Sequence, residues 1–181
     1  MRPGKLGFAV WILAFLAWST LSSGGEAFRR LRLGEEIPDY SLQLLAGGGT
    51  DIRSASALTL INLWATNCTP CRVELPELEQ LQIDYANKGL RVMAVSSETH
   101  AQPALRRILQ ASAPSLIAAL DPRGGLAGRL GAVGMPESFL IDANGRLLWQ
   151  RAGRLQVGAA DARAAIDAYF RSLPKARPGA N

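Results

Sequence analysis

The chain has 181 residues, of which 48% are hydrophobic and 19% charged, a balance typical of a globular protein and not of a disordered one. A chain of this length buries a core large enough to fold without disulfide staples, so any cysteine pair is examined first for chemistry. The formal net charge is +5, but the arginines are scattered and no basic run alternates with aromatic residues, which argues against a nucleic-acid partner.

Residues 1–27 have the features of an export signal. A short positive start precedes an uncharged apolar stretch over residues 6–21, and Gly25-Glu26-Ala27 carries small residues at both positions that a signal peptidase reads. The stretch is short for a membrane-spanning helix and long for a signal core. Two outcomes stay open: cleavage near Ala27, or retention of residues 6–21 as a membrane anchor. Either one places the rest of the chain in the periplasm.

Residues 34–173 have the pattern of one folded domain, followed by a flexible tail over residues 174–181. Strands are predicted over residues 40–45, 58–64, 90–95, 116–120, 137–141 and 146–150. Helices are predicted from the cysteines to Gly89 and over residues 103–111, 125–130 and 159–173. Strands separated by helices imply parallel crossovers, and a hairpin at Asn144-Gly145 adds an antiparallel edge. The order predicts an α/β fold with a mixed central sheet flanked by helices.

The segment Cys68-Thr69-Pro70-Cys71 follows a predicted buried strand and opens a predicted helix. A Cys-x-x-Cys pair in this place is a redox signature. The first cysteine lies at the helix amino terminus, where unpaired N–H groups and the helix dipole favour a thiolate. Cys71 lies one turn further on and close enough to resolve a mixed disulfide. We therefore predict that Cys68 is the reactive thiol.

Two other interpretations of the cysteine pair are weak. A structural disulfide across two residues closes a very small loop and constrains the unfolded chain little. A zinc site needs about four ligands, whereas the chain has two cysteines and a single histidine, His100, which is better explained as a loop residue. We expect no metal and no cofactor other than the redox-active Cys68–Cys71 disulfide.

Two motifs carry a resemblance to a known family. Residues 60–76, Leu-Ile-Asn-Leu-Trp-Ala-Thr-Asn-Cys-Thr-Pro-Cys-Arg-Val-Glu-Leu-Pro, resemble the TlpA/ResA/CcmG family of exported or membrane-tethered thioredoxin-like reductases. Residues 134–142, Gly-Met-Pro-Glu-Ser-Phe-Leu-Ile-Asp, resemble that family's Gly-x-Pro-x-x-Phe-Leu-Ile-Asp segment in its CcmG-type form. The resemblance covers about residues 34–173 and implies a thioredoxin-like fold.

The resemblance also implies roles for particular residues. Pro136 matches a cis-proline that faces the cysteine pair and presents the backbone of Met135 to an extended substrate segment. Trp64, Thr69 and Pro70 complete the implied substrate contact around the cysteines. Glu74 matches an acidic residue near the active site, which can take or return a proton during exchange if burial raises its pKa. A solvated helix carboxylate is the alternative for Glu74.

This sequence departs from related patterns at two positions. Asn62 stands where cytosolic thioredoxins carry a buried aspartate, so that proton acceptor is missing and Glu74 is a candidate to replace it. Asn67 stands where the family usually has tryptophan, which removes an aromatic wall beside Cys68.

The leading hypothesis is an exported thiol–disulfide reductase, monomeric, acting on disulfide-containing exported proteins. By resemblance, the substrates include apocytochrome c, and a membrane carrier of the DsbD or CcdA type supplies the electrons. A thiol peroxidase of the redoxin group is an alternative, but it needs Thr or Ser three residues before the reactive cysteine, where this chain has Ala65. A non-enzymatic module that binds partners through the Pro136 region is the other alternative.

Overall fold

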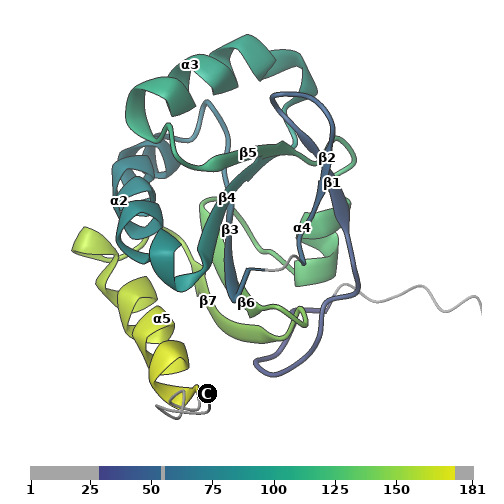
Figure 1. Cartoon of the computed structure of the whole chain (residues 1–181). Coiled ribbons are helices and arrows are strands. Elements are labelled where there is room, and N and C mark those ends of the chain that lie inside the picture. Colours follow the sequence, from purple (N-terminus) through teal and green to yellow (C-terminus); the bar gives the residue numbers. More distant parts are fainter. Residues whose placement is uncertain (1–28, 54–55, 174–181) are drawn as a thin grey trace, which may run out of the picture.

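A seven-stranded mixed sheet forms the centre of the molecule, with strand order β2-β1-β5-β4-β3-β6-β7 (Figure 1). The computed structural model describes residues 29–53 and 56–173. The strands are β1 (Ser41–Leu44), β2 (Gly49–Asp51), β3 (Leu58–Leu63), β4 (Leu90–Ser96), β5 (Ile117–Leu120), β6 (Glu137–Asp142) and β7 (Leu147–Ala152). The predicted signal or anchor over residues 1–27 and the predicted tail over residues 174–181 lie outside the described residues.

β3 lies in the interior of this sheet and all six of its residues are buried. It pairs in parallel with β4 on one side and antiparallel with β6 on the other, and β4 pairs in parallel with β5. A strand buried on both faces needs a nearly continuous apolar run, and Leu58–Leu63 supplies one, interrupted at Asn62. The sequence-based prediction of a mixed thioredoxin-like sheet is confirmed.

Helices cover both faces of the sheet (Figure 1). The helices are α2 (Thr69–Tyr85), α3 (Gln102–Ser112), α4 (Gly125–Leu130) and α5 (Ala160–Ser172), with short 3-10 turns η2 (Ala86–Lys88), η3 (Thr99–Ala101) and η4 (Val157–Ala159). One buried cluster joins α2, α3 and α5 to the sheet, and a second joins α4 to the opposite face. Within the described ranges, none of the helices has the length and apolarity that crossing a membrane requires.

The chain departs from the prediction at two glycine-containing segments. Gly47–Gly49 ends β1 as expected, but the turn also brings the chain back, so that Gly49–Asp51 pairs antiparallel with β1 as β2. This short strand was missed because Thr50-Asp51 lacks apolar alternation. The helix at the cysteines ends at Tyr85, and η2 follows before Gly89 takes a φ of 92°.

Candidate active site

The two cysteines form a disulfide at the amino terminus of α2. Cys68 is the N-cap residue, and its Sγ accepts a hydrogen bond from the backbone N–H of Cys71 at 3.3 Å. Cys68 is half-buried, whereas Cys71 is fully buried in the cluster beneath α2. Thr69 and Pro70 are exposed between them, and proline is suited to the first helical turn because no N–H is needed there. One sulfur is therefore accessible from solvent, and the other lies behind it.

This local arrangement follows from the sequence. β3 ends just before the cysteines, at the carboxyl end of an interior strand. A turn follows, in which Cys68 N–H donates to the carbonyl of Ala65, and this turn leads into α2. At a helix start the first N–H groups have no intrahelical partner and favour negative charge. The Cys68 sulfur therefore lies where negative charge is favoured, whereas the Cys71 sulfur lies in the apolar cluster beneath α2.

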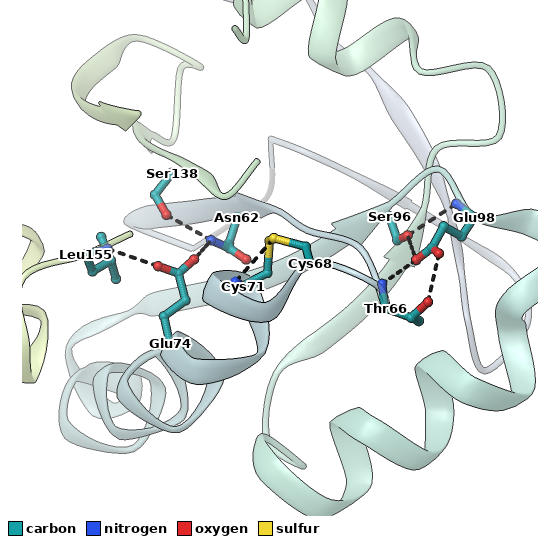
Figure 2. Close-up of a disulfide and its surroundings, with 9 residues drawn as sticks. All are labelled: Asn62, Thr66, Cys68, Cys71, Glu74, Ser96, Glu98, Ser138 and Leu155. Atoms are coloured by element: carbon teal, nitrogen blue, oxygen red, sulfur yellow. Dashed lines mark hydrogen bonds between the residues drawn. A yellow bond between two sulfur atoms is a disulfide. The ribbon is translucent and has the colours of Figure 1, made fainter. Parts of the chain in front are cut away.

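Glu74 lies on α2 one turn after Cys71, is fully buried, and belongs to a hydrogen-bonded network (Figure 2). Asn62 Nδ2 donates to Glu74 Oε1 at 2.7 Å and to Ser138 Oγ at 3.0 Å. The backbone N–H of Leu155 donates to Glu74 Oε2 at 3.0 Å. Figure 2 shows Asn62 between Glu74 and the disulfide. β3 and the segment after β7 thus bind the carboxyl group on α2, and β6 joins the network through the bond between Ser138 and Asn62.

Burial raises the pKa of the Glu74 carboxyl, and the hydrogen bonds from Leu155 and Asn62 oppose that rise. A carboxyl group in this setting exchanges a proton closer to neutral pH than a surface glutamate does. Glu74 is therefore not a solvated helix carboxylate. Asn62, which stands where cytosolic thioredoxins carry an aspartate, orients Glu74 through a hydrogen bond from its amide. Its own Oδ1 is buried without a hydrogen-bond donor in the described part of the chain.

A second carboxylate holds the loop that precedes Cys68 (Figure 2). Glu98, in the loop after β4, accepts hydrogen bonds from Thr66 N at 2.6 Å, from Thr66 Oγ1 at 2.8 Å and from Ser96 Oγ at 3.3 Å. Sequence reasoning missed both Glu98 and Ser138. Ser138 could have been predicted from a model of the sheet, because it lies opposite Asn62 in the pairing of β3 with β6. Glu98 had no signal, since it is far from the cysteines in sequence and belongs to no motif.

The Met135–Pro136 peptide bond is cis, as the resemblance implies. Pro136 is buried, and Met135 is 52% exposed. Met135 and Trp64 line an apolar cavity of about 240 Å³ on the α4 side of the sheet, between the carboxyl ends of β3 and β4, α4 and the loop before β6. Trp64 is only 1% exposed, so any substrate contact of this residue is confined to the cavity wall.

The two remaining positions of interest differ in their surroundings. Asn67 is exposed immediately before Cys68, so the site lacks a covering aromatic there. Ala65 is buried and has no hydroxyl group to offer a peroxide near Cys68. The structure thus leaves the cysteine pair without the hydroxyl that the peroxidase hypothesis requires.

The chain matches known proteins over most of the folded part. The Redoxin family model matches residues 32–166. Thiol:disulfide interchange protein DsbE of Escherichia coli K12 is 32% identical over 127 residues, which cover 68% of this chain and 66% of that protein. Thiol-disulfide oxidoreductase ResA of Bacillus thuringiensis is 27% identical over 158 residues, which cover 84% of this chain and 91% of that protein.

A solved structure agrees with these sequence matches. A crystal structure described as a thiol:disulfide interchange protein DsbE from Chlorobium tepidum superimposes with a TM-score of 0.69 at 31% identity, covering 76% of this chain and 97% of the other. The site geometry, the match over residues 32–166 and these relatives agree with one another. The chain belongs to the Redoxin family, and the relatives it resembles there are named as thiol–disulfide interchange proteins and oxidoreductases.

Proposed function

We propose that this protein reduces disulfides in exported proteins, with Cys68 as the attacking thiol and Cys71 as the resolving thiol. The observation that carries the proposal is the asymmetry of the pair: Cys68 is half-buried at a helix start, and Cys71 is fully buried beside the Glu74 network. A thiolate at Cys68 can reach a partner, whereas Cys71 can reach only the sulfur of Cys68. This geometry favours exchange in two ordered steps.

In the first step the Cys68 thiolate attacks a substrate disulfide, forming a mixed disulfide and releasing one substrate sulfur as thiolate. In the second step the Cys71 thiol loses its proton, and its sulfur attacks Cys68 Sγ. The Cys68–Cys71 disulfide forms, and the second substrate sulfur leaves as thiolate and takes up a proton. Two electrons pass from the enzyme dithiol to the substrate disulfide.

Glu74 is the proposed proton acceptor for Cys71. It lies one turn along α2 from Cys71, it is fully buried, and burial raises its pKa, which makes it a better proton acceptor than a surface glutamate. Asn62 fixes the carboxyl group through a 2.7 Å hydrogen bond. The unpartnered Oδ1 of Asn62 offers an acceptor for the S–H of reduced Cys71.

The substrate is proposed to lie as an extended segment along Met135, just before β6. Met135 is exposed and follows directly on the exposed Gly134, so its backbone is open to strand-like pairing with a second chain. The adjacent cavity of about 240 Å³ takes one apolar side chain of that segment. Thr69 and Pro70, exposed between the cysteines, form the opposite border of the contact.

The direction of transfer is proposed to be reductive, with a potential of about −200 to −270 mV, between glutaredoxin and thioredoxin values. Threonine and proline between the cysteines supply no cation or histidine that would stabilise the thiolate form as in strong oxidants. Equilibration with glutathione measures this value. A potential near that of strong periplasmic oxidants, about −120 mV, would mean that the protein makes disulfides.

The place of action is proposed to be the periplasm, with residues 6–21 serving as a signal core or as an inner-membrane tether. The substrate class is exported proteins whose cysteines must be reduced before metallation, apocytochrome c among them. A membrane carrier of the DsbD or CcdA type returns electrons to the oxidised enzyme. The relatives named as thiol:disulfide interchange protein DsbE and thiol-disulfide oxidoreductase ResA support the thiol–disulfide exchange on which this assignment rests.

Mixed-disulfide trapping tests the proposal. In the Cys71→Ala variant, Cys68 attacks a substrate but the complex cannot be resolved, so covalent adducts accumulate in periplasmic extract and dissolve on reduction. The Cys68→Ala/Cys71→Ala variant is the matched control and should trap nothing. A purely binding module would give no covalent adduct with either variant, and that result would overturn the enzymatic proposal. Identification of the trapped proteins then names the substrates.

A further inference from the structure

An ion pair lies next to the proposed substrate loop, on the opposite face of the sheet from Glu74. Glu137 is the first residue of β6 and follows Pro136 directly, and its side chain is fully buried. Arg30 Nη2 lies 2.8 Å from Glu137 Oε1. The backbone N–H of Val133 donates to Glu137 Oε2 at 2.7 Å. One carboxylate thus joins a residue near the amino-terminal end of the domain to the loop that carries Met135.

Side chains alternate along β6, which separates the two networks. Ser138 pairs with Asn62 and contacts the Glu74 side, whereas Glu137 pairs with Leu63 and points to the α4 side. The cavity beside Met135 lies on that same α4 side. Glu137 therefore acts on the shape of the loop and the cavity, and it does so without touching the cysteines.

Arg30 is held in place by the backbone around it. The neighbouring Leu31 is buried, and its N–H donates to the carbonyl of Leu130 at the end of α4. Its carbonyl accepts a hydrogen bond from Gln150 of β7 at 3.3 Å. Gly131 packs so closely that a Cβ there would lie 2.3 Å from Arg30 Cα. This segment is docked on the domain, so the backbone of Arg30 is held within reach of Glu137.

A buried carboxylate requires a compensating charge, since desolvation of an unpaired charge is very unfavourable. Among the described residues, Glu137 Oε1 has no hydrogen-bond donor apart from its contact with the Arg30 guanidinium. Removing that charge leaves the buried carboxylate uncompensated, which favours conformations in which the loop that Glu137 Oε2 anchors opens to water. The Arg30 charge and the conformation of residues 133–136 are thereby linked.

We propose that Arg30 is a positioning residue that acts through Glu137 to hold the loop of residues 133–136 in its substrate-binding conformation. That the loop receives substrate rests on the proposed function. That Arg30 fixes the loop rests on the contacts alone. The segment by which the chain enters the domain is then a structural part of the substrate site.

Hydrogen exchange tests the structural half without any reference to activity. In the oxidised full-length protein, Arg30→Gln should raise the exchange rate of the Val133 amide by about tenfold or more. Arg30→Lys, which keeps the charge, should recover most of the protection. Arg29→Gln is the matched control, because Arg29 forms an exposed pair with Glu35 and should leave Val133 unchanged. Wild-type protection of Val133 in Arg30→Gln would overturn the proposal.

A double-mutant cycle tests the route through Glu137. Arg30→Gln/Glu137→Gln carries no lone buried charge and keeps an amide oxygen for Val133, so it should fold even if Arg30→Gln alone does not. In the Glu137→Gln background, Arg30→Gln should change Val133 exchange by less than about twofold, because the charge to be compensated is gone. An equal effect in both backgrounds would show that Arg30 does not act through Glu137.

Kinetics then connect the loop to substrate. Arg30→Gln should raise the KM for a protein disulfide about tenfold and leave kcat and the alkylation rate of Cys68 near wild type, because the cysteines lie on the other face of the sheet. An unchanged KM alongside altered exchange would remove the substrate role of the loop and keep the structural link. Absence of any disulfide reduction by the wild-type protein would defeat the proposed function and leave the exchange results standing.

Discussion

Two carboxylates lie on either side of the disulfide, and their surroundings differ. Glu74 is fully buried behind Cys71, and its two hydrogen bonds come from Asn62 and Leu155. Glu98 is half-buried beside the residues before Cys68, and its hydrogen bonds come from the backbone and hydroxyl of Thr66 and from Ser96. Figure 2 shows the pair with the disulfide between them.

The difference separates a group that can exchange a proton from a group that fixes a loop. Burial dominates at Glu74 and raises its pKa, which fits the proton transfer proposed for it. Glu98 binds both polar groups of Thr66, so its oxygens are occupied in holding the approach to the helix. Variants of Glu74 should therefore change the pH dependence of mixed-disulfide resolution, whereas variants of Glu98 should change stability.

The largest effect is expected from Asn62→Asp, which places a second carboxyl group against Glu74. Two buried acids in contact raise the pKa of the pair, and the variant should lose about 3–5 kcal/mol of stability at neutral pH. Because the native pKa values lie above the unfolded ones, stability is regained as pH falls and lost as pH rises through the raised values. Denaturant unfolding at acidic and neutral pH measures this. Asn87→Asp, an exposed position, is the control and should show no such loss.

Glu74→Gln should slow resolution of a preformed Cys68 mixed disulfide by about 100-fold, a typical contribution of general base catalysis and equivalent to about 2.7 kcal/mol. In the wild type the resolution rate should increase as pH rises through the raised pKa of Glu74, because only the carboxylate accepts the proton. The variant should lack this step.

Folding should survive this substitution. The Asn62 amide can turn over, so that its oxygen accepts from the new amide and from the Ser138 hydroxyl. Ionisation of a buried acid with a raised pKa costs stability as pH rises, so the glutamine variant should be at least as stable as wild type at neutral pH. Glu79→Gln, further along α2, is the control. A wild-type pH profile in Glu74→Gln would remove Glu74 from the mechanism.

Glu98→Ala should reduce stability by about 1–3 kcal/mol, because the N–H of Thr66 loses its acceptor in a half-buried loop. The pH step in mixed-disulfide resolution should remain, since Glu74 is untouched. Glu98→Gln keeps one acceptor oxygen and should retain most of the stability. Loss of the pH step in Glu98→Ala would show that the two carboxylates are not separable in function.

The smallest effect is expected from Asn67→Trp, which covers Cys68 without contacting either carboxylate network. Shielding of the half-buried sulfur should slow alkylation of reduced Cys68 by about two- to fivefold. Stability and the resolution profile should stay near wild type. Acceleration of alkylation would mean that the exposed asparagine already restricts access to the sulfur.

The sequence predicted the fold well because the informative patterns are local. The continuous apolar run of β3, the cysteines at a helix start and the Asn144-Gly145 turn each specify structure within a few residues. The hydrogen-bond partners of Glu74 were harder to predict, because the donors Asn62 and Leu155 lie far from each other in the chain. The sequence shows Asn62 only as a replacement for an aspartate, because its role as a donor to Glu74 and Ser138 depends on how β3, β6 and α2 are placed.

Glu98 and Arg30 were not predictable for the same reason. Each is a single charged residue whose partner lies 32 or more positions away, and a lone charge in a sequence is usually solvated. Burial of Glu137 is the physical fact that gives Arg30 its importance, and burial of a polar residue is not encoded by periodicity. Only the structure shows which distant residues lie close enough to pair, as Glu98 does with Thr66 and Arg30 with Glu137.

The burial of Cys71 has a consequence for how the enzyme meets its partners. With only Cys68 half-exposed, the oxidised form accepts electrons and the reduced form donates them through one and the same sulfur. Donor and substrate then occupy the site in turn and never together, so two-substrate kinetics follow a ping-pong pattern with parallel double-reciprocal lines. Excess substrate then competes with the donor for the oxidised enzyme, and the flow of electrons is set by how quickly the two partners replace each other at Cys68.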